Sequence, residues 1–111
     1  MENIEQILNQ LQAQNQQLQT IILQKQTMII QEKEIENALE AIEKSESDIY
    51  KSVGPILIKT NKTDIKKELD EQKNEIAIKM KTLEIQEKKL KEKIKNNQEK
   101  LQQLMSVGQG G

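Results

Sequence analysis

The sequence lacks the residue types on which most catalytic and metal sites depend. It has no cysteine and no histidine, which excludes thiolate and imidazole zinc sites and catalysis by either side chain. Its four glycines are Gly54 and three at the C-terminus, so there is no Gly-rich phosphate loop. We interpret acidic runs such as Glu32, Glu34 and Glu36 as solvated helix faces. No enzymatic activity, no metal and no cofactor are therefore expected.

Aromatic side chains are scarce as well. There is no Phe or Trp, and only one Tyr and one Pro, while 34% of residues are hydrophobic and 32% are charged. This composition makes a compact globular core difficult and is typical of long helices or coiled coils. The 111 residues suffice for one domain at most. No signal peptide and no membrane-spanning run of about 20 apolar residues occurs, so we expect a soluble, cytoplasmic protein.

Arginine is also absent, and the net charge is −1. The chain therefore lacks the side chain that binds phosphate and guanine with two parallel hydrogen bonds. One basic run stands out, made up of Lys88, Lys89, Lys91, Lys93 and Lys95. Because glutamates interrupt and flank this run, we expect no nucleic-acid partner. The lack of a membrane-spanning run predicts that there is no membrane partner either.

Residues 49–60 are the one stretch that reads as β-structure. They are rich in β-branched residues, and Gly54-Pro55 interrupts them where a type II′ turn would fall. This turn pairs Val53 with Ile56 and predicts a hairpin with apolar side chains on both faces. A two-stranded hairpin cannot bury two apolar faces by itself, so we expect it to carry oligomerisation. The residues expected at that interface are Ile49, Tyr50, Val53, Ile56, Leu57 and Ile58.

Long helices are predicted on both sides, over residues 3–45 and 62–105, with a disordered tail over 106–111. Asn3 with Gln6, and Asn61 with Asp64, are capping pairs at the two helix starts. Apolar residues recur in steps of four and three, which indicates a coiled coil. In the first helix the predicted core positions are Ile4, Leu8, Leu11, Asn15, Leu18, Ile22, Lys25 and Ile29. The pattern shifts by one residue near Met28, and the core then continues through Glu32, Ile35, Leu39 and Ile42. In the second helix the predicted core positions are Ile65, Leu69, Gln72, Ile76, Met80, Leu83, Glu87, Leu90, Ile94, Asn97, Leu101 and Leu104.

An antiparallel pairing of these helices brings both chain ends together. It places Ile42 near Ile65 and Ile4 near Leu104, and it leaves more apolar surface at the chain ends than two helices can cover. Such surface belongs either to a wider bundle or to a partner. The residues expected to bind a partner there are Ile4, Ile7, Leu8, Leu11, Leu101, Leu104, Met105 and Val107. A second apolar cluster, Met28, Ile29, Ile78 and Met80, is the next candidate.

The order of helix, hairpin and helix resembles the beta-class subunit of prefoldin over nearly the whole chain. The specific part is Tyr50-Lys51-Ser52-Val53-Gly54 followed by Leu57-Ile58-Lys59-Thr60. Alpha-class subunits are longer and have two hairpins, so one hairpin favours the beta class. The resemblance implies a single prefoldin-like domain over 1–111. The abundance of Lys, Ile and Asn with no Arg suggests an AT-rich, archaeal source.

The resemblance also implies a function and an assembly. Two alpha and four beta subunits, including further copies of this chain, would join their hairpins in a β-barrel that carries six coiled coils. The coiled-coil tips would hold non-native proteins without ATP and pass them to a group II chaperonin. Two alternatives stay open: a structural coiled-coil spacer, and an RNA-binding helical arm. Salt-sensitive binding would identify the latter.

Overall fold

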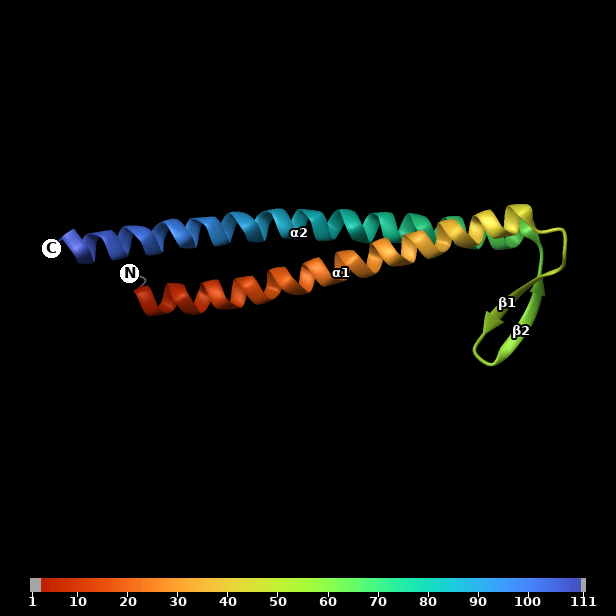
Figure 1. Ribbon diagram of the computed structural model, residues 1–111, viewed down its shortest axis with the longest axis horizontal. Coiled ribbons are helices and arrows are strands. Elements are labelled where there is room, and N and C mark those ends of the chain that lie inside the picture. The colour runs from red at the N-terminus through yellow and green to blue at the C-terminus, as the bar shows by residue number, and fades with distance from the viewer. Residues whose placement is uncertain (1–2, 111) are drawn as a thin grey trace. The chain divides into compact units, whose positions relative to one another are not determined.

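Two long helices flank one β-hairpin in the computed structural model, which describes residues 3–110 and the side chains of residues 3–106 (Figure 1). Helix α1 spans Ile4–Lys44, strand β1 Ile49–Val53, strand β2 Ile56–Thr60 and helix α2 Lys62–Gly110. This confirms the predicted mainly-α fold and both strands. A β-barrel would need further chains, so the barrel stays a prediction. No helix in the described part of the chain is long and apolar enough to cross a membrane.

Each helix contributes a segment to both of two compact units. The hairpin unit is Gln26–Met80, and the terminal unit is Met1–Lys25 together with Lys81–Gly111. In the hairpin unit, Glu36 pairs with Lys73 at 3.6 Å and Glu43 pairs with Lys66. In the terminal unit, Lys25 pairs with Glu87 at 3.0 Å and Gln10 with Asn97 at 3.2 Å. Later α2 residues face earlier α1 residues in both units, which confirms the antiparallel pairing.

Both helices begin with the predicted capping pairs. The backbone N–H of Gln6 donates to Asn3 Oδ1 at 2.8 Å, and the N–H of Asn3 donates back to Gln6 Oε1 at 3.1 Å. At α2, the N–H of Asp64 donates to Asn61 Oδ1 at 2.8 Å, and Asn61 Nδ2 donates to Asp64 Oδ2 at 2.9 Å. These bonds satisfy N–H groups that have no partner within the helix, which is why the helices start there.

The hairpin has the predicted register. Val53 pairs with Ile56, Lys51 with Ile58 and Ile49 with Thr60 in an antiparallel sheet. Gly54 has a φ of 60°, the positive value that the first central residue of a type II′ turn requires, and Pro55 supplies the negative φ that follows. The turn thus fixes which side chains share a face of the hairpin.

The core of α1 follows a different phase from the predicted one. Ile7 is 1% exposed, whereas Leu8, the predicted core residue, is 50% exposed. A series of buried and half-buried positions runs along α1: Ile7, Leu11, Gln14, Leu18, Ile21, Lys25, Met28, Glu32, Ile35, Leu39 and Ile42. Beside this series, Ile22 and Ala38 are also half-buried. The series keeps steps of four and three throughout, so the predicted shift near Met28 is wrong. Apolar residues occur in adjacent pairs at 7–8, 21–22 and 28–29, and the pattern alone did not decide which member faces α2.

The core of α2 matches the prediction at all but one of its interior positions. Ile76, Leu90, Ile94 and Asn97 are all buried. Gln72 is exposed instead, and the half-buried neighbour Lys73 takes that step. A seven-residue interval can divide as three plus four or four plus three, and the long Lys73 side chain reaches Glu36 on α1.

Helix α2 continues to Gly110, beyond the predicted end near residue 105. The disorder of residues 106–111 stays a prediction. Residue 111 lies outside the described residues. Glycine weakens a helix by about 1 kcal/mol relative to alanine but does not block it sterically. Gly108 therefore permits a helix end without enforcing one.

Candidate functional site

The hairpin presents apolar side chains on both of its faces. We define the hairpin surface as Ile49, Tyr50, Val53, Ile56, Leu57 and Ile58. From the pairing register, Ile49, Val53, Ile56 and Ile58 share one face, and Tyr50 and Leu57 share the other. Ile49 is half-buried, but the other five are exposed, up to 70% for Leu57. An uncovered apolar surface of this kind marks an interaction site.

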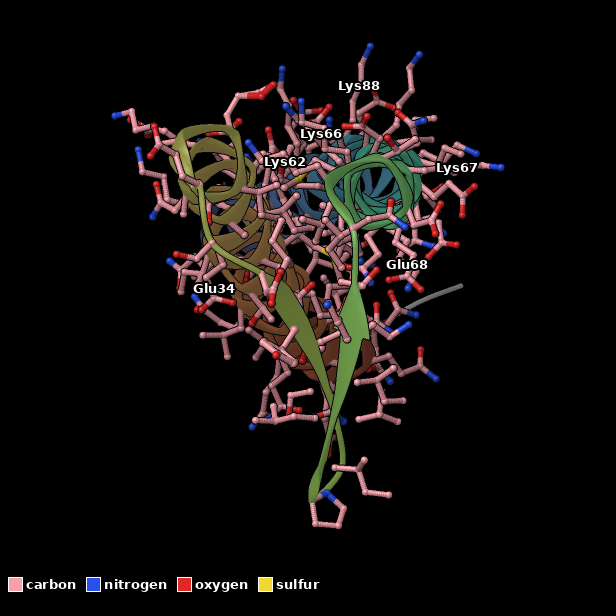
Figure 2. The ribbon with its side chains drawn as sticks, turned by 90° about the vertical axis from the view of Figure 1, so that its right-hand side faces the viewer. Glu34, Lys62, Lys66, Lys67, Glu68 and Lys88 are labelled. Carbon is pink, nitrogen blue, oxygen red and sulfur yellow. The ribbon has the colours of Figure 1, made fainter. Side chains whose placement is uncertain are left out.

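The hairpin is tied to α2 through its strand residues and extends away from the helices of its unit (Figure 2). Lys51 Nζ donates to Glu68 Oε1 at 2.6 Å. Lys59 and Asp48 lie 3.6 Å apart. These contacts hold the part of the hairpin nearest the helices, whereas the apolar residues next to the turn remain uncovered.

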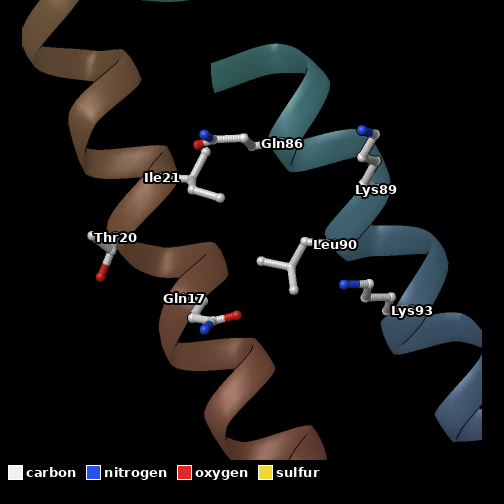
Figure 3. Close-up of a pocket in the computed structure, with 7 residues that line it drawn as sticks. All are labelled: Gln17, Thr20, Ile21, Gln86, Lys89, Leu90 and Lys93. Atoms are coloured by element: carbon white, nitrogen blue, oxygen red, sulfur yellow. The ribbon is translucent and has the colours of Figure 1, made fainter. Parts of the chain in front are cut away.

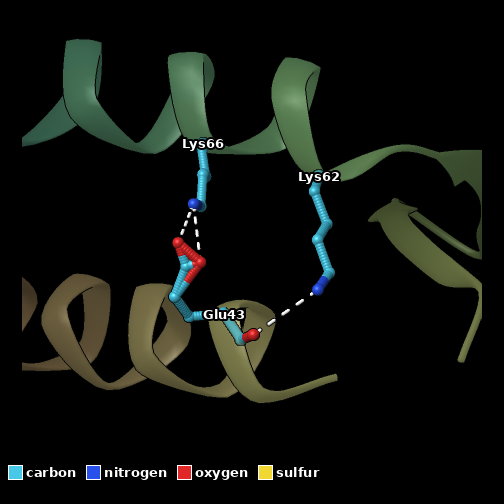
Figure 4. A network of polar contacts seen from close by, with 3 residues as sticks. All are labelled: Glu43, Lys62 and Lys66. Atoms are coloured by element: carbon cyan, nitrogen blue, oxygen red, sulfur yellow. Dashed lines mark hydrogen bonds and ion pairs between the residues drawn. The ribbon is translucent and has the colours of Figure 1, made fainter. Parts of the chain in front are cut away.

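A small polar network joins the end of α1 to the start of α2 (Figure 4). Lys66 Nζ donates to the Glu43 carboxylate, at 2.7 Å from Oε2, and lowers the pKa of that carboxyl group through the hydrogen bond and its charge. Lys62 Nζ donates to the Glu43 backbone carbonyl at 3.4 Å. That carbonyl is one of the last four of α1, which lack partners within the helix. The network fixes the helix ends from which the hairpin starts.

The two-stranded sheet in the described residues has two free edges. Unpaired backbone groups on such edges form hydrogen bonds with strands of other chains. Together with the two apolar faces, they make the hairpin incomplete as an isolated element. Its chemistry is that of an assembly surface.

The second candidate surface is the terminal cluster, which we define as the eight residues predicted to bind a partner at the chain ends. Ile4, Leu8 and Met105 are exposed. Leu11, Leu101 and Leu104 are half-buried core residues. Ile7 is fully buried in the core, so its assignment as a partner-binding residue is corrected: it packs between the helices. The side chain of Val107 lies outside the described residues.

Polar residues in the core of the terminal unit form a contact that sequence reasoning missed. Asn97 is buried, and its Nδ2 donates to Gln10 Oε1 at 3.2 Å and to Gln14 Oε1 at 3.1 Å. Asn97 was predicted at a core position, but its partners were not. The sequence signal for this contact is an amide residue at a core position of one helix, with glutamines available on the opposite helix.

A second polar contact crosses the same unit. Lys25 Nζ lies 3.0 Å from Glu87 Oε1, and the two side chains are 25% and 16% exposed. The hydrogen bond from Lys25 is the main cause that lowers the pKa of Glu87; partial burial opposes it, and the charges of Lys25 and Lys91 assist it. Both residues were predicted at core steps of the heptad pattern, although not as partners.

Aliphatic side chains make up most of both surfaces. Among the described residues, no three acidic side chains are grouped so that they could hold a metal ion. What the two surfaces offer is aliphatic area and, at the hairpin, free backbone hydrogen-bonding groups. Both are suited to binding other polypeptides.

Comparison with known proteins agrees with this arrangement. A family model described as a prefoldin subunit matches residues 5–107. The crystal structure of the prefoldin beta subunit from Thermococcus strain KS-1 is similar, with a TM-score of 0.82 and 35% sequence identity over 93% of this chain and 96% of that chain. No curated protein matches the sequence. The chain therefore belongs to the prefoldin subunit family.

Proposed function

We propose that the protein is a beta-class chaperone subunit that holds non-native proteins on its terminal cluster without ATP. The observation that carries this proposal is the exposure of Ile4, Leu8 and Met105 beside half-buried core leucines. Membership of the prefoldin family supports a chaperone role. Aliphatic side chains bind unfolded segments through burial, which has no directional requirement and needs no nucleotide.

The small size of the terminal cluster requires several copies to act together. Burial yields about 25 cal/mol per Å² of apolar area, from which the cost of association is subtracted. Three exposed side chains offer little area, so one copy binds a client weakly. Copies joined in one assembly raise the effective concentration of the other copies around a bound client.

The hairpin surface supports the assembly part of the proposal. We infer a cytoplasmic hexamer of two alpha and four beta subunits, in which the hairpins form a β-barrel and clients pass to a group II chaperonin. Five exposed apolar residues and two free edges support burial of this hairpin by other strands. No observation specifically favours a structural spacer or an RNA-binding arm.

The test replaces the exposed members of the terminal cluster and leaves the core intact. The triple variant Ile4→Ser, Leu8→Ser, Met105→Ser should keep the assembly but lose most suppression of aggregation of a chemically denatured client, because the apolar contact area is gone. Light scattering of the diluted client without nucleotide measures this.

A matched control replaces three exposed apolar residues outside both candidate clusters: Leu23→Ser, Ile30→Ser and Ile85→Ser. These side chains are at least as exposed as those of the test variant. The control should suppress aggregation as well as the unmodified protein. Equal loss in both triple variants would move the client site away from the terminal cluster.

A further inference from the structure

A groove lies between α1 and α2 within the terminal unit, apart from the terminal cluster. Its volume is about 430 Å³. Ile21 and Leu90 point toward one another across it (Figure 3) and give it an aliphatic floor. Gln17 and Thr20 line the side formed by α1. The groove is thus neutral on one side and apolar at its base.

Two lysines, Lys89 and Lys93, line the side formed by α2. They lie four residues apart and therefore on the same face of the helix. None of the ion pairs formed by the described side chains includes either one. Lys93 has no acidic residue three or four positions away, and α1 carries no charge between Gln6 and Gln24. Neither positive charge is therefore held in an ion pair, although Glu92 lies three positions after Lys89.

The other lysines of the same run have a different environment. Lys91 lies 3.9 Å from Glu87. Lys88 and Lys95 border a separate hollow that Glu84 and Glu92 also line. The basic run thus divides into a face with acidic neighbours and a face that adjoins the apolar groove.

We propose that this groove binds segments of non-native polypeptides in which apolar side chains alternate with carboxylates. The aliphatic floor accepts the apolar side chain, and Lys89 and Lys93 pair with the carboxylates beside it. A nucleic acid fits less well, because the groove has no aromatic side chain on which a base could stack. This inference rests on the proposed function, to which it adds a preference for acidic client segments.

The test uses the assembled protein and a short fluorescent peptide of alternating Leu and Glu. Lys89→Gln with Lys93→Gln should weaken binding about three- to tenfold, as expected for the loss of two partly exposed charge pairs. Binding of the same peptide with Gln in place of Glu should not change. Fluorescence anisotropy at low salt measures both affinities, and the preference for Glu should shrink as salt is added.

Lys88→Gln with Lys95→Gln is the matched control, because it removes the same charge from the same helix outside the groove. It should bind the acidic peptide like the unmodified protein. A charge-reversed variant, Lys89→Glu with Lys93→Glu, should instead prefer a peptide of alternating Leu and Lys. Circular dichroism would check that each variant keeps its helix content.

Three results would overturn the inference. These are an equal loss in both lysine-to-glutamine variants, no preference of the unmodified protein for Glu over Gln, and displacement of the peptide by a short RNA that binds more tightly. If the unmodified protein still suppressed client aggregation, the proposed function would stand and only the groove assignment would fall. If it neither bound peptides nor suppressed aggregation, both would fall.

Discussion

At the scale of single residues, the contacts that orient the helix pair of the terminal unit are polar. A buried amide at a core position of a coiled coil favours one register, because other registers would leave it without partners. Asn97 has such partners in Gln10 and Gln14. Lys25 and Glu87 form a second polar contact between core positions of the two helices. Adjacent apolar residues such as Ile21 and Ile22 fit the helix interface in more than one register. The polar contacts favour one of these registers.

Removal of the buried amide should therefore destabilise the protein. We expect Asn97→Ala to lower the free energy of unfolding by about 1–2 kcal/mol, because the glutamine amides lose their partner and a small void remains. Asn96→Ala is the control: Asn96 is exposed, and alanine favours the helix. Urea denaturation of the two variants measures the difference. Equal stability of both variants would contradict a register role for Asn97.

Glu87 makes stability depend on pH. Its pKa is lowered in the folded protein from an ordinary value of 4.5, so the unfolded chain binds more protons in that range. The stabilisation is present above pH 4.5 and is lost as the pH falls through the lowered value. Glu87→Gln should therefore reduce the fall of Tm on acidification, whereas Glu84→Gln on an exposed position should not. A parallel fall of Tm in all three proteins would contradict this.

The heptad pattern of the sequence predicts which residues lie in the core, but not which residues they contact. The heptad placed Asn97, Lys25 and Glu87 in the core, because steps of four and three identify one helix face. It did not identify their partners, since those depend on how far one helix slides along the other. It also chose Leu8 over Ile7, because two adjacent aliphatic residues fit the same step equally well.

At the scale of elements, the hairpin was the most predictable part. Its register follows from a two-residue turn, and Gly54-Pro55 allows few turn types. The helix starts were predictable for the same reason, because each cap depends on residues three positions apart. The end of α2 was not, since glycine permits a helix end but does not require one.

The hairpin surface should carry oligomerisation. We expect Val53→Asp with Ile58→Asp to abolish the oligomer, because a carboxylate buried in an apolar interface without a partner costs several kcal/mol. Both helices should remain, because neither residue belongs to them. Sedimentation velocity and circular dichroism report the two properties.

The control for this variant adds two carboxylates at exposed helix positions of the same unit, Gln31→Asp with Asn74→Asp. It should sediment like the unmodified protein. If the hairpin variant also sedimented as the unmodified assembly, the hairpin would not be the interface.

At the scale of the whole molecule, the chain is incomplete by itself. Besides the helix core, the hairpin surface and the terminal cluster hold apolar residues that no other part of the described chain covers. Further apolar residues along the helices are exposed as well: Leu23, Ile29, Ile30, Ile78 and Ile85. The hairpin surface has free strand edges, which suits permanent assembly, and the terminal cluster has only exposed side chains, which suits reversible contact with irregular partners. Assembly through the hairpin would bring several terminal clusters together on one client, so the proposed function depends on the oligomer.

The mass of the native assembly tests the proposed oligomer directly. Native mass spectrometry of the 12.8-kDa chain, alone and mixed with a prefoldin alpha subunit from the same source, identifies the subunits in each complex. The mixture should give one dominant species with two alpha subunits and four copies of this chain. A chain that remains at its monomer mass in both samples would contradict the proposed oligomer.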